Sequence, residues 1–196
     1  MRSFFKFFSA TASFAVLATT VLLSTAAHAQ DNPVVVMETN KGTIKIELWA
    51  DKAPISAANF LRYTDAEFYD GLIFHRVIEG FMVQGGGFNE DMVQQPPYES
   101  IKNEASADLP NNRGTLAMAR TNVIDSATSQ FFINLVDNDF LNHTDETARG
   151  FGYAVFGEVI EGMEVVDAMA TVSTGRERGH QNVPKEPIKM ISVRRQ

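Results

Sequence analysis

Cysteine is absent from this chain of 196 residues, and its absence excludes several kinds of protein. Without a thiol there is no disulfide scaffold, no thiol nucleophile, no CxxC redox site, no cysteine-ligated zinc and no lipid attached through cysteine. Basic residues are also few, since 17 lysines and arginines stand against 24 aspartates and glutamates. A surface that neutralises phosphates needs clustered cations, and the sequence has no run of them. We therefore expect no nucleic-acid partner.

Other signatures are missing as well. The spacing of His75, His143 and His180 does not match a zinc motif such as HxxxH, so we expect no metal and no other cofactor. No GxSxG motif surrounds Ser129, which leaves a secreted hydrolase as a weak alternative. The sequence shows no internal repeat and no low-complexity tract. With 44% hydrophobic and 21% charged residues, the composition is that of one globular domain.

The first 29 residues have the pattern of a cleavable signal peptide. Arg2 and Lys6 precede an apolar stretch from Phe7 to Leu23, and Ala27-His28-Ala29 matches a signal peptidase site. We predict cleavage after Ala29. The pattern is typical of bacterial signal peptides and therefore predicts a periplasmic or secreted protein. The alternative is an uncleaved membrane anchor, but five serine and threonine residues interrupt the apolar stretch. Cleavage would leave a mature domain of residues 30–196 without membrane contact, and would change the formal charge from −7 to −9.

The mature chain has the pattern of many short strands and two helices. Thr43–Leu48 alternates polar and apolar residues, and Asn40-Lys41-Gly42 before it predicts a hairpin with the run 33–38. Pro54 predicts the start of a helix of about three turns, and apolar spacing predicts a second helix over 163–170. Further strands are expected at 74–78, 82–84, 115–119, 130–135, 153–159 and 189–193, and long loops at 87–113 and 142–152. This tally indicates an all-β barrel or sandwich.

Three segments carry the residues that are candidates for chemistry. They are FHRVIEGFMVQGG at 74–86, GTLAMAR at 114–120 and SQFFI at 129–133. If Arg76, Phe81, Met82 and Gln84 converge on one face, they form a cleft for a neutral, partly apolar ligand. The alternative is that the apolar residues are core and the polar ones are solvated. Neighbouring residues on a strand point to opposite faces, so one phenylalanine of the SQFFI segment can be core while the next lines a pocket.

In this order and spacing, these segments closely resemble the cyclophilin family of peptidyl-prolyl isomerases. The resemblance runs from about Val34 to Val193, and IKNEA at 101–105 and FGYAVFG at 151–157 are similar to the bacterial periplasmic subgroup. It implies an all-β fold, an eight-stranded antiparallel closed barrel capped by two α-helices, and isomerisation of X-Pro bonds in exported proteins during folding.

The resemblance also implies roles for individual residues. Arg76 matches the catalytic arginine, with Phe81 and Gln84 as the other catalytic positions. The implied substrate-binding residues are His75, Met82, Ala119, Arg120, Gln130, Phe132, Phe140, Leu141 and Tyr153. His75 matches the neighbour of the arginine, and we expect a structural or orienting part for it.

Three positions depart from the best-known pattern of the family. Phe140 stands where a tryptophan is associated with binding cyclosporin, Tyr153 replaces a histidine, and Arg120 stands where many relatives have asparagine. Loss of the indole N–H removes a hydrogen-bond donor but keeps a ring. We therefore expect isomerase activity with weak cyclosporin binding, and a changed peptide contact at residue 120.

The expected partners are proline-containing segments of unfolded or folding exported proteins, and the expected oligomeric state is a monomer. The main rival is a binding module, in which the same barrel holds peptides as a chaperone or adaptor with little turnover. The intact set of Arg76, Phe81, Gln84 and Phe132 favours the enzyme.

Overall fold

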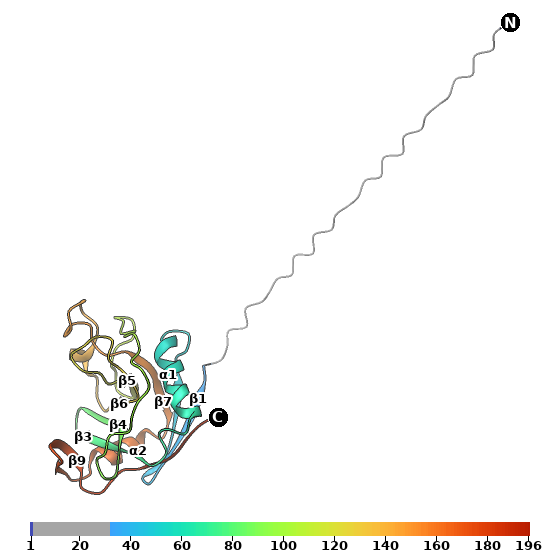
Figure 1. Ribbon diagram of the computed structural model, residues 1–196. Coiled ribbons are helices and arrows are strands. Elements are labelled where there is room, and N and C mark those ends of the chain that lie inside the picture. The colour runs from blue at the N-terminus through green and yellow to red at the C-terminus, as the bar shows by residue number, and fades with distance from the viewer. Residues whose placement is uncertain (2–31) are drawn as a thin grey trace. The chain divides into compact units, whose positions relative to one another are not determined.

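Eight antiparallel strands form a nearly closed barrel in residues 32–196, which together with Met1 are the residues that the computed structural model describes (Figure 1). The predicted signal peptide otherwise lies outside the described residues. Within them, no helix is both long and apolar enough to span a bilayer. The barrel strands are β1 (Val34–Thr39), β2 (Gly42–Leu48), β3 (Leu72–Ile78), β4 (Met82–Asn89), β5 (Thr115–Met118), β6 (Phe131–Asn134), β7 (Val155–Glu161) and β10 (Met190–Arg195).

The strand order around the barrel is β10-β1-β2-β7-β5-β6-β4-β3. The first and last strands pair along their length, with Met37 opposite Val193, as the pattern at 189–193 predicted. A seam between β3 and β10 completes the ring. There the Gly71 amide donates to the Met190 carbonyl at 2.8 Å, and the Phe74 amide donates to the Ile188 carbonyl at 2.9 Å. The all-β barrel expected from the sequence is confirmed, with this seam as its least regular junction.

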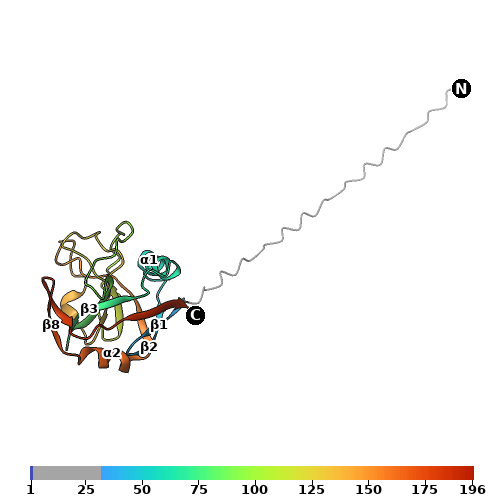
Figure 2. The same ribbon diagram turned by 60° about the horizontal axis from the view of Figure 1, so that its bottom comes forward.

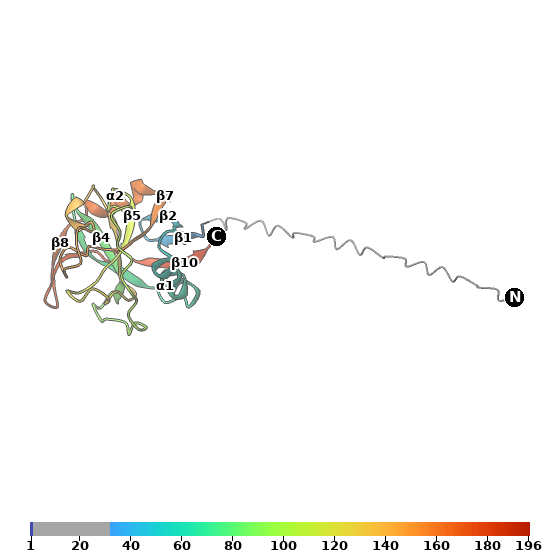
Figure 3. The same cartoon turned by 90° about the horizontal axis from the view of Figure 1, so that it is seen from above.

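Two α-helices cover opposite ends of the barrel (Figures 2 and 3). Helix α1 (Pro54–Asp65) begins at a proline, as predicted, and packs against β7 and β10. Helix α2 (Met163–Ala170) has the predicted bounds and packs against β2, β3 and β4. A short 3₁₀ turn, η1 (Asp139–Leu141), was not predicted because three residues give no readable periodicity.

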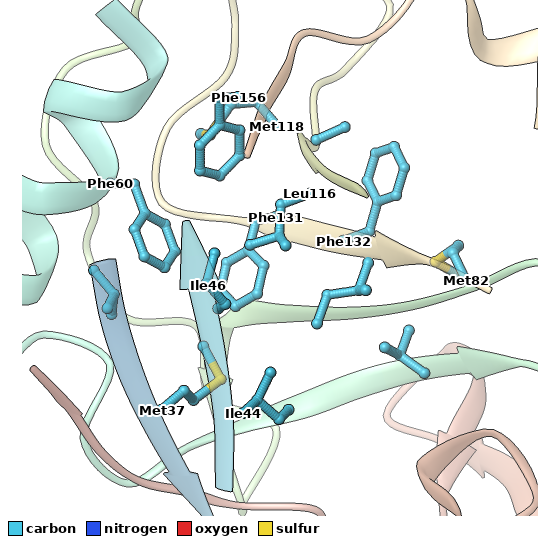
Figure 4. Packing of buried hydrophobic residues seen from close by; sticks show 14 of the residues in the cluster. Met37, Ile44, Ile46, Phe60, Met82, Leu116, Met118, Phe131, Phe132 and Phe156 are labelled. Atoms are coloured by element: carbon cyan, nitrogen blue, oxygen red, sulfur yellow. The ribbon is translucent and has the colours of Figure 1, made fainter. Parts of the chain in front are cut away.

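The core follows from the alternation in the strands. Ile44, Ile46 and Leu48 of β2 are fully buried while the residues between them are not, as the polar-apolar period predicts. Figure 4 shows Phe60 from α1 approaching Phe131 of β6, which lies inside the barrel. Phe131 and Phe132 leave β6 in opposite directions, so the predicted division of the pair is confirmed.

The first of the two long loops is attached to helix α1 by a side chain. At the N-terminus of α1, the Glu104 carboxylate accepts hydrogen bonds from the Ile55 and Ser56 amides at 3.0 and 2.7 Å. A carboxylate at this position satisfies free amides and complements the helix dipole. The first loop begins later than expected, because β4 continues through Gly87 to Asn89.

A second sheet was not predicted. Strands β8 (Thr174–Glu177) and β9 (His180–Pro184) form a hairpin, and β9 contacts β3. The residues of β8 and the first residues of β9 are partly or fully exposed, so the hairpin has no apolar alternation that a sequence could reveal. Arg178 and Gly179 form its turn, and both have positive φ.

Gly86 in β4 provides a test of close packing in the interior of the barrel. Its φ is +83°, and a Cβ there would lie 2.8 Å from the Ser129 carbonyl oxygen and 3.0 Å from the Tyr69 ring. We expect Gly86→Ala to lower the free energy of unfolding by about 1–3 kcal/mol, because strain and overlap add. Urea unfolding measures the loss. Gly175→Ala is the matched control, since its Cβ would have no neighbour nearer than 3.7 Å; equal losses in both variants would contradict the explanation.

Candidate active site

Nine of the twelve predicted site residues line one pocket of about 120 Å³ on the barrel. They come from five places in the sequence: β3, the β3–β4 turn with β4, the end of β5, β6, and the segment from η1 to β7. The nine residues are Arg76, Phe81, Met82, Gln84, Ala119, Arg120, Phe132, Leu141 and Tyr153. Arg76 and Gln84 are half-buried in the pocket and are not solvated surface groups. Met82, Phe132 and Leu141 line the pocket and also belong to the buried core, so the alternative holds in part for the apolar members.

Arg76 provides one of the two cations of the pocket, and Arg120 provides the other. Its Nη1 lies 3.2 Å from Gln84 Oε1 and 4.0 Å from Met82 Sδ, and its guanidinium lies 5.8 Å from the centre of the Phe81 ring. Burial lowers the pKa of Arg76 from its ordinary value. An arginine nevertheless remains charged at neutral pH. No carboxylate among residues 32–196 forms a salt bridge with it, so most of its N–H groups can bind a ligand.

Gln84 is oriented from both ends. Its Oε1 accepts from Arg76, and its Nε2 donates to Gln130 Oε1 at 3.0 Å. These two bonds fix the direction of the amide and leave its second N–H free to donate. Gln130 does not line the pocket; it lines the neighbouring polar hollow and acts on the pocket through Gln84. The arrangement presents a cation and an amide donor side by side.

The other half of the pocket is apolar. Phe81, Met82, Phe132 and Leu141 supply its wall, and the Phe132 and Tyr153 rings meet edge to face with centroids 5.7 Å apart. Figure 4 shows the Phe132 ring on one side of β6 with Met82 nearby. Such a wall excludes water from a small ring and complements the two polar groups opposite.

A buried network of three asparagines supports the wall, and sequence reasoning missed it. Asn138 Nδ2 donates to the Phe81 carbonyl at 3.0 Å and to Asn134 Oδ1 at 2.8 Å. Asn111 Nδ2 donates to the Leu141 carbonyl at 3.2 Å, and Asn111 Oδ1 accepts from Asn134 Nδ2 at 3.4 Å. These bonds hold the backbone of two pocket residues. In the sequence, Asn111 lies within the predicted loop 87–113, and nothing there indicates its burial.

Arg120 stands at the rim and joins two loops. Its guanidinium donates to the carbonyls of Gly152, Thr121 and Ala148 at 2.9, 2.9 and 2.8 Å. It also lies over the Tyr153 ring, 4.9 Å from the centroid. Arg120 therefore shapes the pocket as well as lining it, and the changed peptide contact at this position stays a prediction.

Two predicted residues lie beside the pocket. Phe140 is 74% exposed on η1, with its ring centroid 5.5 Å from that of Phe81. His75 is buried, and its ring centroid lies 4.7 Å from that of Phe88. Among the described residues, its Nδ1 is a buried side-chain atom without a hydrogen-bond partner. His75 directly precedes Arg76 in β3 and is buried against Phe88, and its expected orienting part stays a prediction.

The buried imidazole predicts a pH dependence of stability. Burial, with smaller effects of His180 and Arg76, lowers the pKa of His75 from 6.5 to about 4. The unfolded chain therefore binds a proton between pH 6.5 and 4 that the folded chain does not. The free energy of unfolding decreases as the pH is lowered through this window. We expect wild type to lose about 2 kcal/mol relative to His75→Gln between pH 7 and 5.

Urea unfolding at both pH values measures this difference, and His75→Phe is a second variant without a titrating group. Both variants should give the same relative change, although their stabilities at pH 7 differ. A parallel pH dependence in wild type and in both variants would show that the imidazole is not the source.

The described residues contain no group of three or more histidines, aspartates and glutamates that could hold a metal ion. The pocket offers two arginines, one oriented amide and an apolar wall. This set can hold an uncharged five-membered ring and place a cation against an amide, and it contains no nucleophile.

Comparisons with known proteins identify the family. The model of the cyclophilin type peptidyl-prolyl cis-trans isomerase/CLD family matches residues 34–195. A "Peptidyl-prolyl cis-trans isomerase" of Acinetobacter baylyi is 59% identical over 167 residues, covering 85% of this chain and 87% of its own. The "Peptidyl-prolyl cis-trans isomerase B" of Escherichia coli is 56% identical over 160 residues, covering 82% and 98%.

The fold comparison agrees. A crystal structure of a Cryptosporidium parvum cyclophilin type peptidyl-prolyl cis-trans isomerase matches with a TM-score of 0.69 and 25% identity, covering 84% of this chain and 98% of that one. The crystal structure of the same protein in the presence of the dipeptide Ala-Pro matches with a TM-score of 0.67 and 26% identity, covering 82% and 96%. The chain therefore belongs to the cyclophilin-type peptidyl-prolyl cis-trans isomerases.

Proposed function

We propose that this isomerase is exported and works in the bacterial periplasm, where it accelerates rotation about X-Pro bonds of exported proteins as they fold. The observation that carries the proposal is the signal-peptide pattern directly before the catalytic domain. Cleavage after Ala29 would leave only residues 30–33 ahead of β1. Bacterial relatives at 52–59% identity, against 36% for relatives from a plant and an amoeba, support the bacterial subgroup.

In this proposal Arg76 is the catalytic group. An X-Pro amide resists rotation because resonance stiffens the C–N bond, with a barrier of about 18–20 kcal/mol for amides. In the twisted state the nitrogen becomes pyramidal and gains a lone pair. A guanidinium directed at this nitrogen binds the twisted state better than the planar one, which is the requirement for catalysis. No bond to carbon is made or broken.

The other residues position the bond. Phe81, Met82, Phe132 and Leu141 would hold the proline ring against the apolar wall. The free N–H of Gln84 would hold a flanking carbonyl of the peptide, so that one side of the bond is anchored while the other rotates. Shortening an X-Pro lifetime from about 100 s to about 1 ms requires roughly 7 kcal/mol. Positioning together with one charged hydrogen bond can supply an effect of this size.

The proposed partners are short proline-containing segments, bound by a monomer. A barrel that only held peptides would need the apolar wall but not Arg76. The polar chain from Arg76 through Gln84 to Gln130 therefore favours turnover over holding.

The export half of the proposal is tested by cell fractionation in a Gram-negative host. We expect the full-length protein in the osmotic-shock fraction, with an intact mass that lacks residues 1–29. A variant without residues 2–29 is the matched control and should stay in the cytoplasm with equal isomerase activity. Full-length protein found uncleaved in the membrane fraction would instead support an anchor.

The folding half is tested with an exported substrate whose refolding is limited by prolyl isomerisation. We expect the mature protein to accelerate the slow phase, and the Arg76→Ala variant to leave it unchanged. Suppressed aggregation without acceleration of the slow phase would support the holding module.

We expect cyclosporin to inhibit the wild type weakly. Phe140 presents an exposed ring beside Phe81 but no N–H donor. We expect Phe140→Trp to lower the inhibitory concentration of cyclosporin in a peptide isomerisation assay, with isomerase activity retained. Equal inhibition of wild type and variant would show that the missing donor does not limit binding.

A further inference from the structure

The arginines of residues 32–196 divide into two groups. Arg62, Arg113, Arg194 and Arg195 each form a salt bridge with a carboxylate. The other five arginines of this part of the chain have no carboxylate within 4.0 Å, and three of them surround the active site; these three are Arg76, Arg120 and Arg149. An acidic chain thus keeps uncompensated positive charge where its substrate binds.

Arg149 lines a hollow of about 530 Å³ that continues the proline pocket. The two share Arg120, Leu141 and Tyr153, so a peptide in one can extend into the other. Phe140 lines the hollow as well and presents an exposed ring.

Arg120 gives the hollow a fixed shape and a permanent charge. Its three carbonyl partners and the Tyr153 ring hold the guanidinium, but none of them neutralises it. One partner is the Ala148 carbonyl, which anchors the loop next to Arg149. The guanidinium of Arg149 is therefore brought to the rim of the hollow on an attached loop.

The acids of the same loop are directed elsewhere. Asp145 accepts hydrogen bonds from the Thr147 amide and hydroxyl, and Glu146 lies 3.9 Å from His143 Nε2. Neither carboxylate forms a salt bridge with Arg120 or Arg149. A carboxylate from outside the protein can therefore meet both cations without displacing an internal partner.

We propose that this hollow, the arginine subsite, binds an acidic side chain within two residues of the isomerised proline. Arg149 pairs with the carboxylate, Arg120 adds its field, and Phe140 covers the aliphatic part of the side chain. The inference deepens the isomerase activity and rests on it. Long-range repulsion by the acidic chain does not prevent the contact, because at physiological salt charges act over about 8 Å.

The test compares short X-Pro peptides that carry Glu, Gln or Lys at one of four positions, namely the two residues before the proline and the two residues after it. The quantity measured is the ratio of kcat/KM for the Glu peptide to that for the Gln peptide. An exposed ion pair predicts a ratio of about two to five at one or more positions in low salt. The Glu-to-Gln ratio should approach one at high salt. The corresponding ratio of kcat/KM for the Lys peptide to that for the Gln peptide should be below one in low salt.

Arg149→Gln should bring the Glu ratio close to one, and Arg149→Lys should keep part of it. Arg176→Gln is the matched control: this arginine is exposed on β8, lines neither hollow and has no carboxylate partner, so the ratio should stay at the wild-type value. A wild-type ratio of one at all positions, or a ratio that survives Arg149→Gln, would overturn the proposal. Rates on the Gln peptides report the isomerase activity separately.

Discussion

Arg76→Ala is expected to lower kcat/KM on a short X-Pro peptide by about 10²–10³-fold, the loss typical of removing one group that stabilises a transition state. The reason is that Arg76 is the cation beside Gln84 in the pocket and has no carboxylate partner within residues 32–196. In the proposed mechanism, the variant loses the group that distinguishes the twisted amide from the planar one and keeps the apolar wall that holds the ring. Protease-coupled or NMR exchange measurements of cis/trans interconversion give the rate.

Two variants sharpen this test. Arg76→Lys retains a charge but loses the rigid fork of donors, so its rate should lie between those of wild type and alanine. Arg176→Ala makes the same truncation at an exposed arginine of β8 and should keep the wild-type rate. If Arg76→Ala were folded, bound peptide and turned over at the wild-type rate, the proposed role of this arginine would be refuted.

Phe131→Ala is expected to lower the free energy of unfolding by about 3–5 kcal/mol, as is typical of a buried phenylalanine. Its ring is fully buried and meets the rings of Phe60, Tyr69 and Phe74 edge to face, with centroids 5.3, 5.6 and 6.0 Å away. Truncation therefore leaves a cavity at the centre of an aromatic cluster. Urea or thermal unfolding measures the loss.

The adjacent Phe132→Ala should behave differently. Its ring lines the proline pocket instead of the aromatic cluster, so we expect a smaller loss of stability and a clear rise in KM for X-Pro peptides. Phe131→Ala, assayed at a temperature where it remains folded, should have a KM near that of wild type. Similar changes in both quantities for the two variants would contradict the division of β6 into a core face and a site face.

The alternation of polar and apolar residues was sufficient to predict a strand that has one buried and one exposed face. It located β2 through Ile44 and Ile46, and the helical spacing of apolar residues located both helices. The alternation failed at β4, where Gly85, Gly86 and Gly87 suggest a break but belong to the strand. These glycines allow close approach of neighbouring groups: a Cβ on Gly87 would lie 2.6 Å from the Gln130 side chain. Such contacts are tertiary and leave no local pattern.

The candidate site shows a similar limit. Arg76, Phe81 and Gln84 lie within one short segment, so a sequence motif could group them. The supporting asparagines could not be found in this way, because Asn134 and Asn138 have the local character of turn residues and become buried only when the barrel assembles. Their partners lie in other segments, as the bond from Asn138 to the Phe81 carbonyl shows.

The pairing of β1 with β10 sets the order in which the chain can fold. Val35 lies opposite Arg195, so β1, the first of the barrel strands to leave a ribosome, waits for β10, the last of them. Contacts of such long separation are slow to form. Until then both edges of the incomplete sheet are open to pairing with other chains. The nascent enzyme is thus itself an incomplete β-protein until its last residues are released.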